Sequence, residues 1–319
     1  MRVIEPVTID DVRAARDRIA RTVTRTPLLR LNVDAPAEIY LKLESLQPIG
    51  SFKLRGASNA IRMLSRDALA RGVYTASAGN MAQGVAWGAR ELDIPCTVIM
   101  PDSAPRTKLD AVTRLGAQIV KVPYDEWWQT LADHGRAGMD GTFIHPVADR
   151  AVMAGNGTIG LEIAEDLPDV DAVLVPFGGG GLVTGIATAI RALAPTANVF
   201  GCEVETSTPL SAALAAKHPV TVERTPSFVD GIGGRRVLDE MWPLVSALID
   251  GALVSSLAET RRAVRLLVER ARIVAEGAGA ASVAPALAGR AGRGKIACVV
   301  SGGNIDLNTL AEILTQPAS

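Results

Sequence analysis

Short apolar runs rich in β-branched residues alternate along this chain with longer segments whose apolar positions recur at helical spacing. The alternation occurs twice, once in each half of the chain, and each short run is bounded by turn residues. Strands followed by helices in this order predict parallel sheets covered by helices, and so an α/β fold. The predicted strands lie at 72–76, 96–100, 117–122, 171–177, 199–205 and 295–301.

Two regions with this pattern predict two domains. A chain of 319 residues is also longer than one hydrophobic core comfortably fills. We expect a small domain at 75–149, inserted into a large domain built from 1–74 and 150–319. Because open α/β sheets bind ligands at the carboxyl ends of their strands, a ligand cleft is predicted between the two domains.

Composition excludes several classes of protein. Hydrophobic residues make up 48% of the chain and charged residues 21%, with a formal net charge of -1, which predicts a globular protein with no nucleic-acid partner. The amphipathic, acid-containing start is unlike a secretory signal, and no apolar run reaches the roughly 18 residues of a membrane span. A cytoplasmic protein without membrane contact is predicted. Cys96, Cys202 and Cys298 lie in apolar runs and are predicted to be buried, inert thiols.

Four consecutive glycines, Gly178, Gly179, Gly180 and Gly181, stand between a predicted strand and a predicted helix. Without Cβ atoms, the amides at this helix N-terminus are open to close approach, and the helix dipole favours an anion there. We favour a phosphate site over the alternative of a tight strand-to-helix turn. No Gly-Lys-Ser/Thr follows, so the run is not a Walker loop.

A second turn of small residues, Ser77-Ala78-Gly79-Asn80-Met81, joins a predicted strand to a predicted helix. Its amides, with the hydroxyl group of Ser77 and the amide of Asn80, form a candidate site for a carboxylate. The alternative, favoured by this segment in isolation, is a plain helix cap by Ser77 or Asn80.

Lys53 follows a Pro48 and Gly50 break, with Ser51 as a predicted helix cap. The pattern places Lys53 in the first turn of a helix, where the dipole disfavours a cation. Such an amine, partly desolvated, has a lowered pKa and suits a nucleophile or a base. The alternative is an ordinary solvated lysine at the surface.

Taken together, these segments resemble the threonine and serine dehydratase group of fold type II pyridoxal-phosphate enzymes, which also includes the serine racemases. The fold implied is tryptophan synthase β-like, with the cofactor in the cleft between two parallel-sheet domains. The resemblance spans nearly the whole chain. Its motifs, in order, are Arg25–Leu28, Gly50–Ala57, Ser77–Gln83, Ala154–Thr158, Gly178–Gly181, Glu276–Ala280 and Ser301–Asn304.

The resemblance assigns roles to individual residues. Lys53 binds pyridoxal 5'-phosphate as a Schiff base and is the catalytic residue, and Phe52 packs beside the ring. Asn80 contacts the ring hydroxyl, Gly178 to Gly181 hold the phosphate, and Ser301 faces the pyridine nitrogen. Counting residues alone leaves a turn role open for Ser301. A neutral hydroxyl does not enforce a protonated pyridine, and this favours elimination.

The implied activity is that of an ammonia-lyase. A β-hydroxy amino acid of the threonine or serine type, or a bulkier one such as phenylserine or hydroxyaspartate, loses water and gives a 2-oxo acid and ammonia. The turn of residues 77 to 81 holds the substrate carboxylate, and relatives imply a homodimer. The alternatives are an amino-acid racemase or a β-replacement synthase of the same fold, and, from another class, a non-catalytic binding protein. The synthases carry a Ser-Val-Lys-Asp-Arg type of motif, whereas this chain has Ser-Phe-Lys-Leu-Arg-Gly.

Three departures from the family pattern restrict this interpretation. Ala78 stands where the racemases carry an acid/base serine, so racemisation is not expected. Met81 replaces a histidine, which predicts a less polar pocket with room for an unusual β-substituent. Pro209 stands where metal-binding relatives carry an aspartate six residues past the equivalent of Glu203, so no metal is predicted.

The aromatic residues Tyr124, Trp127 and Trp128 cluster in a chain with only 4% aromatic residues. Core packing is the favoured use, and a position facing the cleft is the alternative. The three histidines show no metal-ligand spacing and are predicted to be structural. They are His134, His145 and His218.

Overall fold

The larger of two sheets has six strands in the order β1-β2-β10-β7-β8-β9. The computed structural model describes residues 2–104 and 106–315. All neighbouring strands in this sheet are parallel except β1, which pairs with β2 in the antiparallel direction at one edge. The strands are β1 (Leu28–Arg30), β2 (Glu38–Lys42), β7 (Ala172–Pro176), β8 (Asn198–Val204), β9 (Gly251–Ser255) and β10 (Lys295–Val299).

The smaller sheet has four parallel strands in the order β5-β4-β3-β6. Two parallel sheets with helices confirm the α/β fold predicted from the alternating pattern. The first strand of this sheet, β3, starts at Val73, two residues before the predicted limit of the small domain. The limits 75–149 themselves stay a prediction. The strands are β3 (Val73–Ala76), β4 (Cys96–Pro101), β5 (Gln118–Val122) and β6 (Thr142–Phe143).

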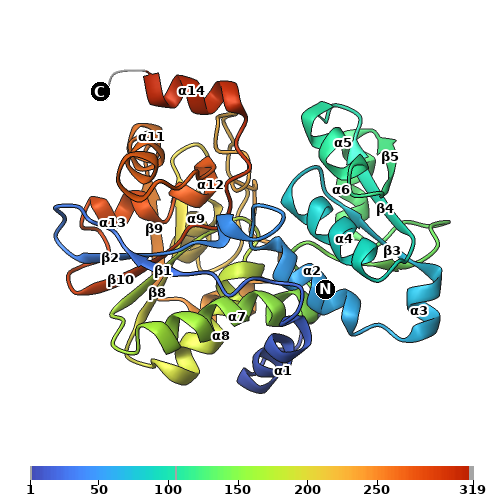
Figure 1. Ribbon diagram of the computed structural model, residues 1–319, viewed down its shortest axis with the longest axis horizontal. Helices are drawn as coiled ribbons and strands as arrows, with labels where there is room; N and C mark the ends of the chain where they lie inside the picture. Colours follow the sequence, from blue (N-terminus) through green and yellow to red (C-terminus); the bar gives the residue numbers. More distant parts are fainter. Residues whose placement is uncertain (1, 105, 316–319) are drawn as a thin grey trace.

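The helices near the smaller sheet form one lobe of the molecule, drawn in cyan and green in Figure 1. Helix α2 lies between this lobe and the rest of the chain, and it packs against both α4 and α7. The first residue of α2 therefore lies at the junction of the lobes. The helices are α2 (Lys53–Arg62), α3 (Arg66–Arg71), α4 (Asn80–Glu91), α5 (Arg106–Thr113) and α6 (Tyr124–Ala132).

Helices cover both faces of the larger sheet (Figure 1). On one face α1 packs against α7 and α8. Glycine at position 185 lets α7 and α8 approach closely, because a Cβ atom there would lie only 2.2 Å from the carbonyl oxygen of Met153. The opposite face has its own apolar cluster. The helices of this part are α1 (Ile9–Ile19), η1 (Glu44–Leu46), α7 (Arg150–Asp166), α8 (Gly181–Leu193), α9 (Pro209–Ala216), α10 (Trp242–Leu248), α11 (Leu257–Leu266), η2 (Leu267–Ala271), α12 (Gly277–Ala280), α13 (Val283–Leu287) and α14 (Leu307–Thr315).

Burial confirms one prediction about the core and corrects another. The three cysteines are free and buried, as predicted. Tyr124 and Trp128 are instead 55% and 45% exposed, so core packing is wrong for both. They lie four residues apart on α6 and share its outer side, while Trp127 packs against the smaller sheet. Among the described residues, no helix is long and apolar enough to cross a bilayer.

Candidate active site

Lys53 begins helix α2, as predicted, and its amine lies inside the junction of the lobes. Its Nζ donates a hydrogen bond to the carbonyl oxygen of Pro146 at 2.8 Å and lies 5.1 Å from the centre of the Phe52 ring. Burial lowers the pKa of Lys53 to about 8. Such an amine is readily deprotonated near neutral pH, which suits a nucleophile or a base. The alternative of a solvated surface lysine is wrong.

The glycine run, Gly178 to Gly181, lies at the N-terminus of α8. It packs against Val147, the residue after the Pro146 that accepts the hydrogen bond from Lys53. Within the described chain, no backbone or side-chain group accepts a hydrogen bond from the amides of residues 178–182. Gly180 has φ +101°, a conformation that suits glycine, and a Cβ at Gly179 would lie 2.7 Å from both γ-carbons of Val147. Unpaired amides at the start of a 13-residue helix suit an anion, and phosphate binding here stays a prediction.

The second turn also presents unpaired amides. Ser77 and Gly79 follow β3, and α4 begins at Asn80. The hydroxyl oxygen of Ser77 accepts a hydrogen bond from the amide of Gly79 at 3.2 Å, while in the described chain the amides of Ala78 and Met81 have no acceptor. A Cβ at Gly79 would meet no atom within 4 Å. The turn therefore combines an internal hydroxyl contact with open amides that suit a carboxylate.

Ser301 lies next to Lys53 through the backbone. The amide of Phe52 donates a hydrogen bond to the Ser301 carbonyl oxygen at 3.0 Å, and Ser51 forms a β-bridge with Gly302. Ser301 is 3% exposed, and its hydroxyl group has no hydrogen-bond partner among the described residues. Ser51 is drawn into this bridge, so the prediction that it caps α2 is wrong: α2 has no side-chain cap.

Asn80, the first residue of α4, contacts Glu276, a carboxyl group for which no role was predicted. Its Nδ2 donates a hydrogen bond to Glu276 Oε1 at 2.8 Å, and its Oδ1 accepts one from Asn304 Nδ2 at 2.8 Å. Burial, followed by repulsion from Asp230, raises the pKa of Glu276 to about 7. The sequence feature that could have identified Glu276 as a site residue is its position at the start of a family motif, Glu276–Ala280.

Met81, the other departure in this turn, does not line the site as predicted. Its side chain is 2% exposed and packs in the core between α2, α4 and the smaller sheet. The prediction that Met81 makes the substrate pocket less polar is therefore wrong. In the first turn of α4, the side chain of Met81 thus points into the core, while its backbone amide stays unpaired within the described chain at the N-terminus of the helix.

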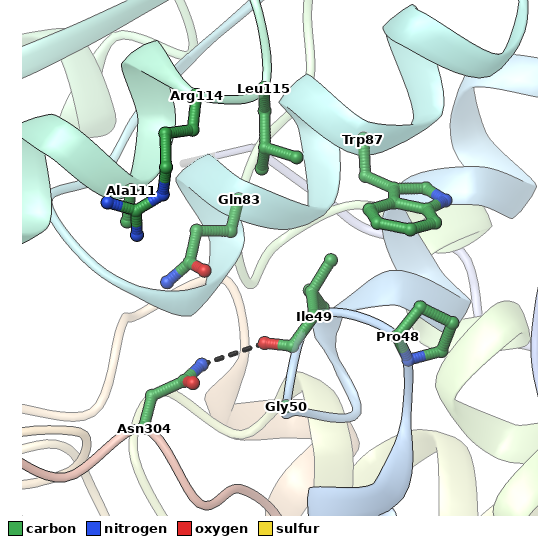
Figure 2. Close-up of a pocket in the computed structure, with 9 residues that line it drawn as sticks. All are labelled: Pro48, Ile49, Gly50, Gln83, Trp87, Ala111, Arg114, Leu115 and Asn304. Carbon is green, nitrogen blue, oxygen red and sulfur yellow. Dashed lines mark hydrogen bonds between the residues drawn. The ribbon is translucent and has the colours of Figure 1, made fainter.

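A cavity of about 270 Å³ lies beside the site. Gln83 and Trp87 of α4 and Arg114 after α5 face the loop of residues 48–50 and Asn304, which follows β10, as Figure 2 shows. Asn304 Nδ2 donates a second hydrogen bond to the carbonyl oxygen of Ile49 at 2.8 Å. Neither Lys53 nor the glycine run lines this cavity, so it neighbours the candidate site through Asn304 alone.

Two of the histidines, His134 and His145, stack with their ring centres 4.3 Å apart. His134, His145 and Glu240 place one possible ligand atom each within 4.8 Å of one another. However, His145 Nδ1 already accepts hydrogen bonds from the amides of Val147 and Ala148, at 3.0 and 2.7 Å, and His134 Nε2 lies 2.7 Å from Glu240. Burial, followed by the charges of His134 and Lys53, lowers the pKa of His145 to about 3. These contacts favour a neutral ring that shapes the 145–148 turn over a metal ligand.

Glu203 likewise has its carboxylate oxygens engaged. They accept hydrogen bonds from the amides of Leu210 and Ser211, at 2.7 and 2.9 Å, and from the Ser211 hydroxyl at 2.7 Å. Glu203 therefore stabilises the first turn of α9, where carboxylates are favoured. That no metal binds at this position stays a prediction.

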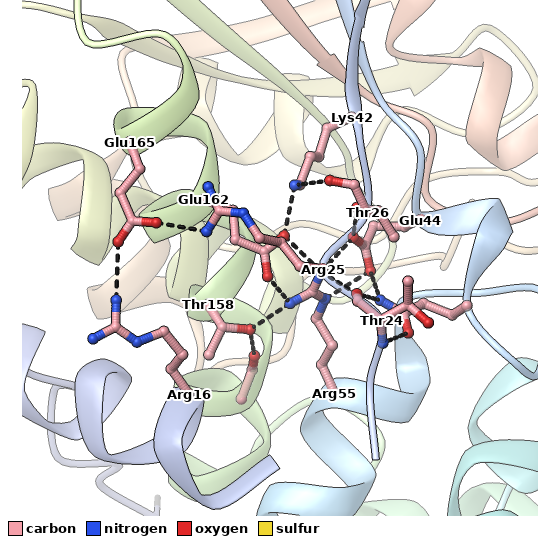
Figure 3. A network of polar contacts seen from close by, with 12 residues as sticks. Arg16, Thr24, Arg25, Thr26, Lys42, Glu44, Arg55, Thr158, Glu162 and Glu165 are labelled. Atoms are coloured by element: carbon pink, nitrogen blue, oxygen red, sulfur yellow. Dashed lines mark hydrogen bonds and ion pairs between the residues drawn. The ribbon is translucent and has the colours of Figure 1, made fainter. Parts of the chain in front are cut away.

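Four buried charged side chains form a network that holds α2 against α7 (Figure 3). They are Lys42, Glu44, Arg55 and Glu162. Arg55 donates through Nε to Glu44 at 2.8 Å and through Nη1 to Glu162 at 2.6 Å, and Lys42 contacts Glu162 at 2.6 Å. Burial alone lowers the pKa of Arg55, but the carboxylates of Glu44 and Glu162 outweigh it and raise the pKa. The charges of the network are balanced, because it contains two cations and two anions. Arg55 fixes α2 at a position two residues after Lys53.

These residues fit pyridoxal phosphate. The buried amine of Lys53 contacts Pro146, and the glycine run with its unpaired amides lies against the next residue, Val147. Ser301 offers an unpaired hydroxyl group, and Asn80 offers an oriented amide. An aldehyde, a phosphate and a ring nitrogen each find a chemically matched group. The individual assignments to cofactor atoms stay predictions.

Comparison with known proteins agrees with this arrangement. Residues 19–302 match the family model described as pyridoxal-phosphate dependent enzyme. The chain is 41% identical to an L-threonine ammonia-lyase of Thermotoga maritima, over 97% of this chain and 79% of that protein. It is 38% identical to the catabolic L-threonine dehydratase of Escherichia coli, over 97% and 96%. The solved structure of maize serine racemase has a TM-score of 0.90 and 31% identity, covering 97% of each chain.

Proposed function

The chain belongs to the pyridoxal-phosphate dependent enzyme family, and from this premise we propose that it is an ammonia-lyase acting on a β-hydroxy amino acid. The substrate is of the threonine or serine type, and the products are a 2-oxo acid and ammonia. The observation that carries this proposal is the buried amine of Lys53, whose pKa is lowered to about 8, beside an anion site of bare helix amides. Similarity to the L-threonine ammonia-lyase of Thermotoga maritima supports the substrate class.

Lys53 supplies the base. When bound, pyridoxal phosphate withdraws electrons from the α-carbon of an amino acid and so makes the α-proton acidic. With its pKa lowered to about 8, a much larger share of the Lys53 amine is neutral near pH 7 than for an ordinary lysine. The neutral Nζ accepts the α-proton, and the nearby Pro146 carbonyl oxygen then stabilises the ammonium form by accepting a hydrogen bond.

The turn of residues 77–81 orients the substrate. Its unpaired amides hold the substrate carboxylate at the N-terminus of α4. Departure of the β-hydroxyl group as water requires a proton, and a general acid at the site supplies it. The resulting enamine takes up water and releases ammonia to give the 2-oxo acid.

Residue 78 supports elimination over racemisation. Racemisation requires a proton donor on the opposite face of the substrate from Lys53, and the methyl group of Ala78 carries no transferable proton. Ala78 is partly exposed in the turn that is proposed to hold the substrate.

Replacing Ala78 by serine is therefore expected to create racemase activity. A positioned acid or base is worth roughly a hundredfold or more, so D-serine formation from L-serine should rise by about that factor. Chiral chromatography of the reaction mixture measures it, with exposed Ala216→Ser as the matched control. If Ala78→Ser still eliminates water but forms no D-serine, the methyl group is not what prevents racemisation.

The substrate panel tests the function itself. Release of 2-oxo acid from serine, threonine, hydroxyaspartate and phenylserine should be detected for at least one of them, with stoichiometric ammonia. A holoenzyme that releases neither product from any of the four contradicts the proposal. We also propose, on the family resemblance alone, a homodimer located in the cytoplasm and a small domain bounded at 75–149.

A further inference from the structure

Glu276 is a buried carboxyl group with an incomplete set of partners. Its residue is 6% exposed, and its backbone amide donates to the carbonyl oxygen of Gly302 at 3.0 Å. Oε1 accepts the hydrogen bond from Asn80, whereas Oε2 has no hydrogen-bond partner in the described chain. Burying a carboxyl group in this way costs free energy unless something compensates. Glu276 therefore has one oxygen held by Asn80 and one oxygen left for another group.

Two glycines leave the space that this carboxyl group occupies. A Cβ at Gly302 would lie 2.5 Å from Glu276 Oε1, and a Cβ at Gly231 would lie 3.4 Å from the same atom. Gly302 follows Ser301, and the carbonyl oxygen of Gly231 lies 3.8 Å from the ideal Cβ position of Gly178. Glu276 therefore lies between the start of the glycine run, at Gly178, and Ser301, the residue predicted to face the pyridine nitrogen.

The amide of Asn80 is fixed in one orientation. Because its Oδ1 accepts from Asn304, and because the carboxyl oxygen Oε1 of Glu276 accepts from Nδ2, the two ends of the amide are not interchangeable. Nδ2 carries two hydrogens, and Glu276 uses one of them. The second is left for another acceptor at the site.

We propose that Glu276 is a positioning residue that acts through Asn80 on the ring hydroxyl of the cofactor, so that the charge on its carboxyl group controls the ionisation of that hydroxyl. The inference rests on the proposed function, since it needs Asn80 to contact the ring oxygen. A carboxylate one side chain away opposes a second negative charge on the ring oxygen, and a neutral carboxylic acid does not.

The surroundings place this change of charge near neutral pH. Burial and then Asp230 raise the pKa of Glu276 to about 7, and the Asn80 hydrogen bond and Lys108 partly offset them. Lys108 of α5 and Asp230 form an ion pair of 2.7 Å. They are the two charged groups that act on the carboxyl group, and they act with opposite signs.

The first test uses the purified holoenzyme and the visible absorption of its bound cofactor. In the wild type the spectrum should change with pH with a midpoint of about 7. Glu276→Gln keeps an oxygen that accepts from Asn80 but does not titrate, so this step should disappear while the cofactor stays bound. The exposed Glu223→Gln is the matched control and should titrate like the wild type.

A second pair of variants tests the coupling without altering Glu276. Asp230→Asn removes the repulsion and leaves Lys108, so the midpoint should move to lower pH. Lys108→Gln leaves Asp230 unopposed, so the midpoint should move to higher pH. Because the two side chains are 36% and 51% exposed, substitution there is expected to disturb the fold less than substitution of Glu276. Shifts of opposite sign support an ionising Glu276, and a purely structural role predicts no shift in either variant.

The outcomes separate this inference from the proposed function. If Glu276→Gln binds the cofactor and its spectrum titrates like that of the wild type, or if the two charge variants leave the midpoint unchanged, the inference is overturned. If the wild-type protein takes up no pyridoxal phosphate at all, the proposed function itself fails.

Discussion

Replacing Lys53 by alanine is expected to abolish both turnover and covalent attachment of the cofactor. The Lys53 amine, which donates to the Pro146 carbonyl oxygen, is both the proposed nucleophile and the proposed base, and alanine has no amine in its side chain. The loss in turnover should reach about a thousandfold or more, as expected when a general base is removed. The visible absorption of the protein-bound cofactor and the release of 2-oxo acid measure the two effects separately.

The matched control for this variant is Lys121→Ala, which removes an exposed lysine from β5 in the smaller sheet. It should keep the absorption band and the turnover of the wild type. Circular dichroism of Lys53→Ala should stay native, because the Lys53 side chain makes a single hydrogen bond within the described chain. Full activity or an unchanged band in natively folded Lys53→Ala would falsify the assignment of this residue.

The second large effect concerns the buried charge network. Arg55→Met removes one cation and leaves Glu44 and Glu162 buried with Lys42 alone. Breaking a buried ion pair from one side costs about 3–5 kcal/mol, because an uncompensated charge remains. We expect the denaturant midpoint of the apo-protein to fall accordingly. Cofactor affinity should fall too, because Arg55 fixes the helix that carries Lys53.

A double variant separates charge imbalance from lost packing. Arg55→Met with Glu44→Gln removes one charge of each sign and leaves the 2.6 Å contact between Lys42 and Glu162. It should be more stable than Arg55→Met alone. Exposed Arg262→Met serves as the surface control and should change the midpoint little. A double variant less stable than the single one would show that hydrogen bonding by Glu44 matters more than balance of charge.

The sequence by itself determined those features that depend on neighbouring residues. The order of strands and helices follows from periodicity, and both sheets confirm it. Four glycines between a strand and a helix can expose bare amides whatever surrounds them, and Lys53 starts α2 because of the break at Pro48 and Gly50. Such local preferences survive folding because no distant contact opposes them.

Only the tertiary structure decided which distant groups meet. Asn80 and Glu276 are 196 residues apart, and Arg55 and Glu162 are 107 apart. No spacing rule connects such pairs. Ser51 failed as a cap because Gly302, from the far end of the chain, draws it into a bridge.

The outward or inward direction of single side chains was also decided by the fold. Met81 points into the core, while Tyr124 and Trp128 face outward. Hydrophobic character favours burial but does not say on which face of a helix the core lies. Burial likewise sets the pKa of Lys53, and burial together with the charge of Asp230 sets the pKa of Glu276. Both depend on what the completed fold places around a group, and for that reason the chemistry of this site is a property of the tertiary structure.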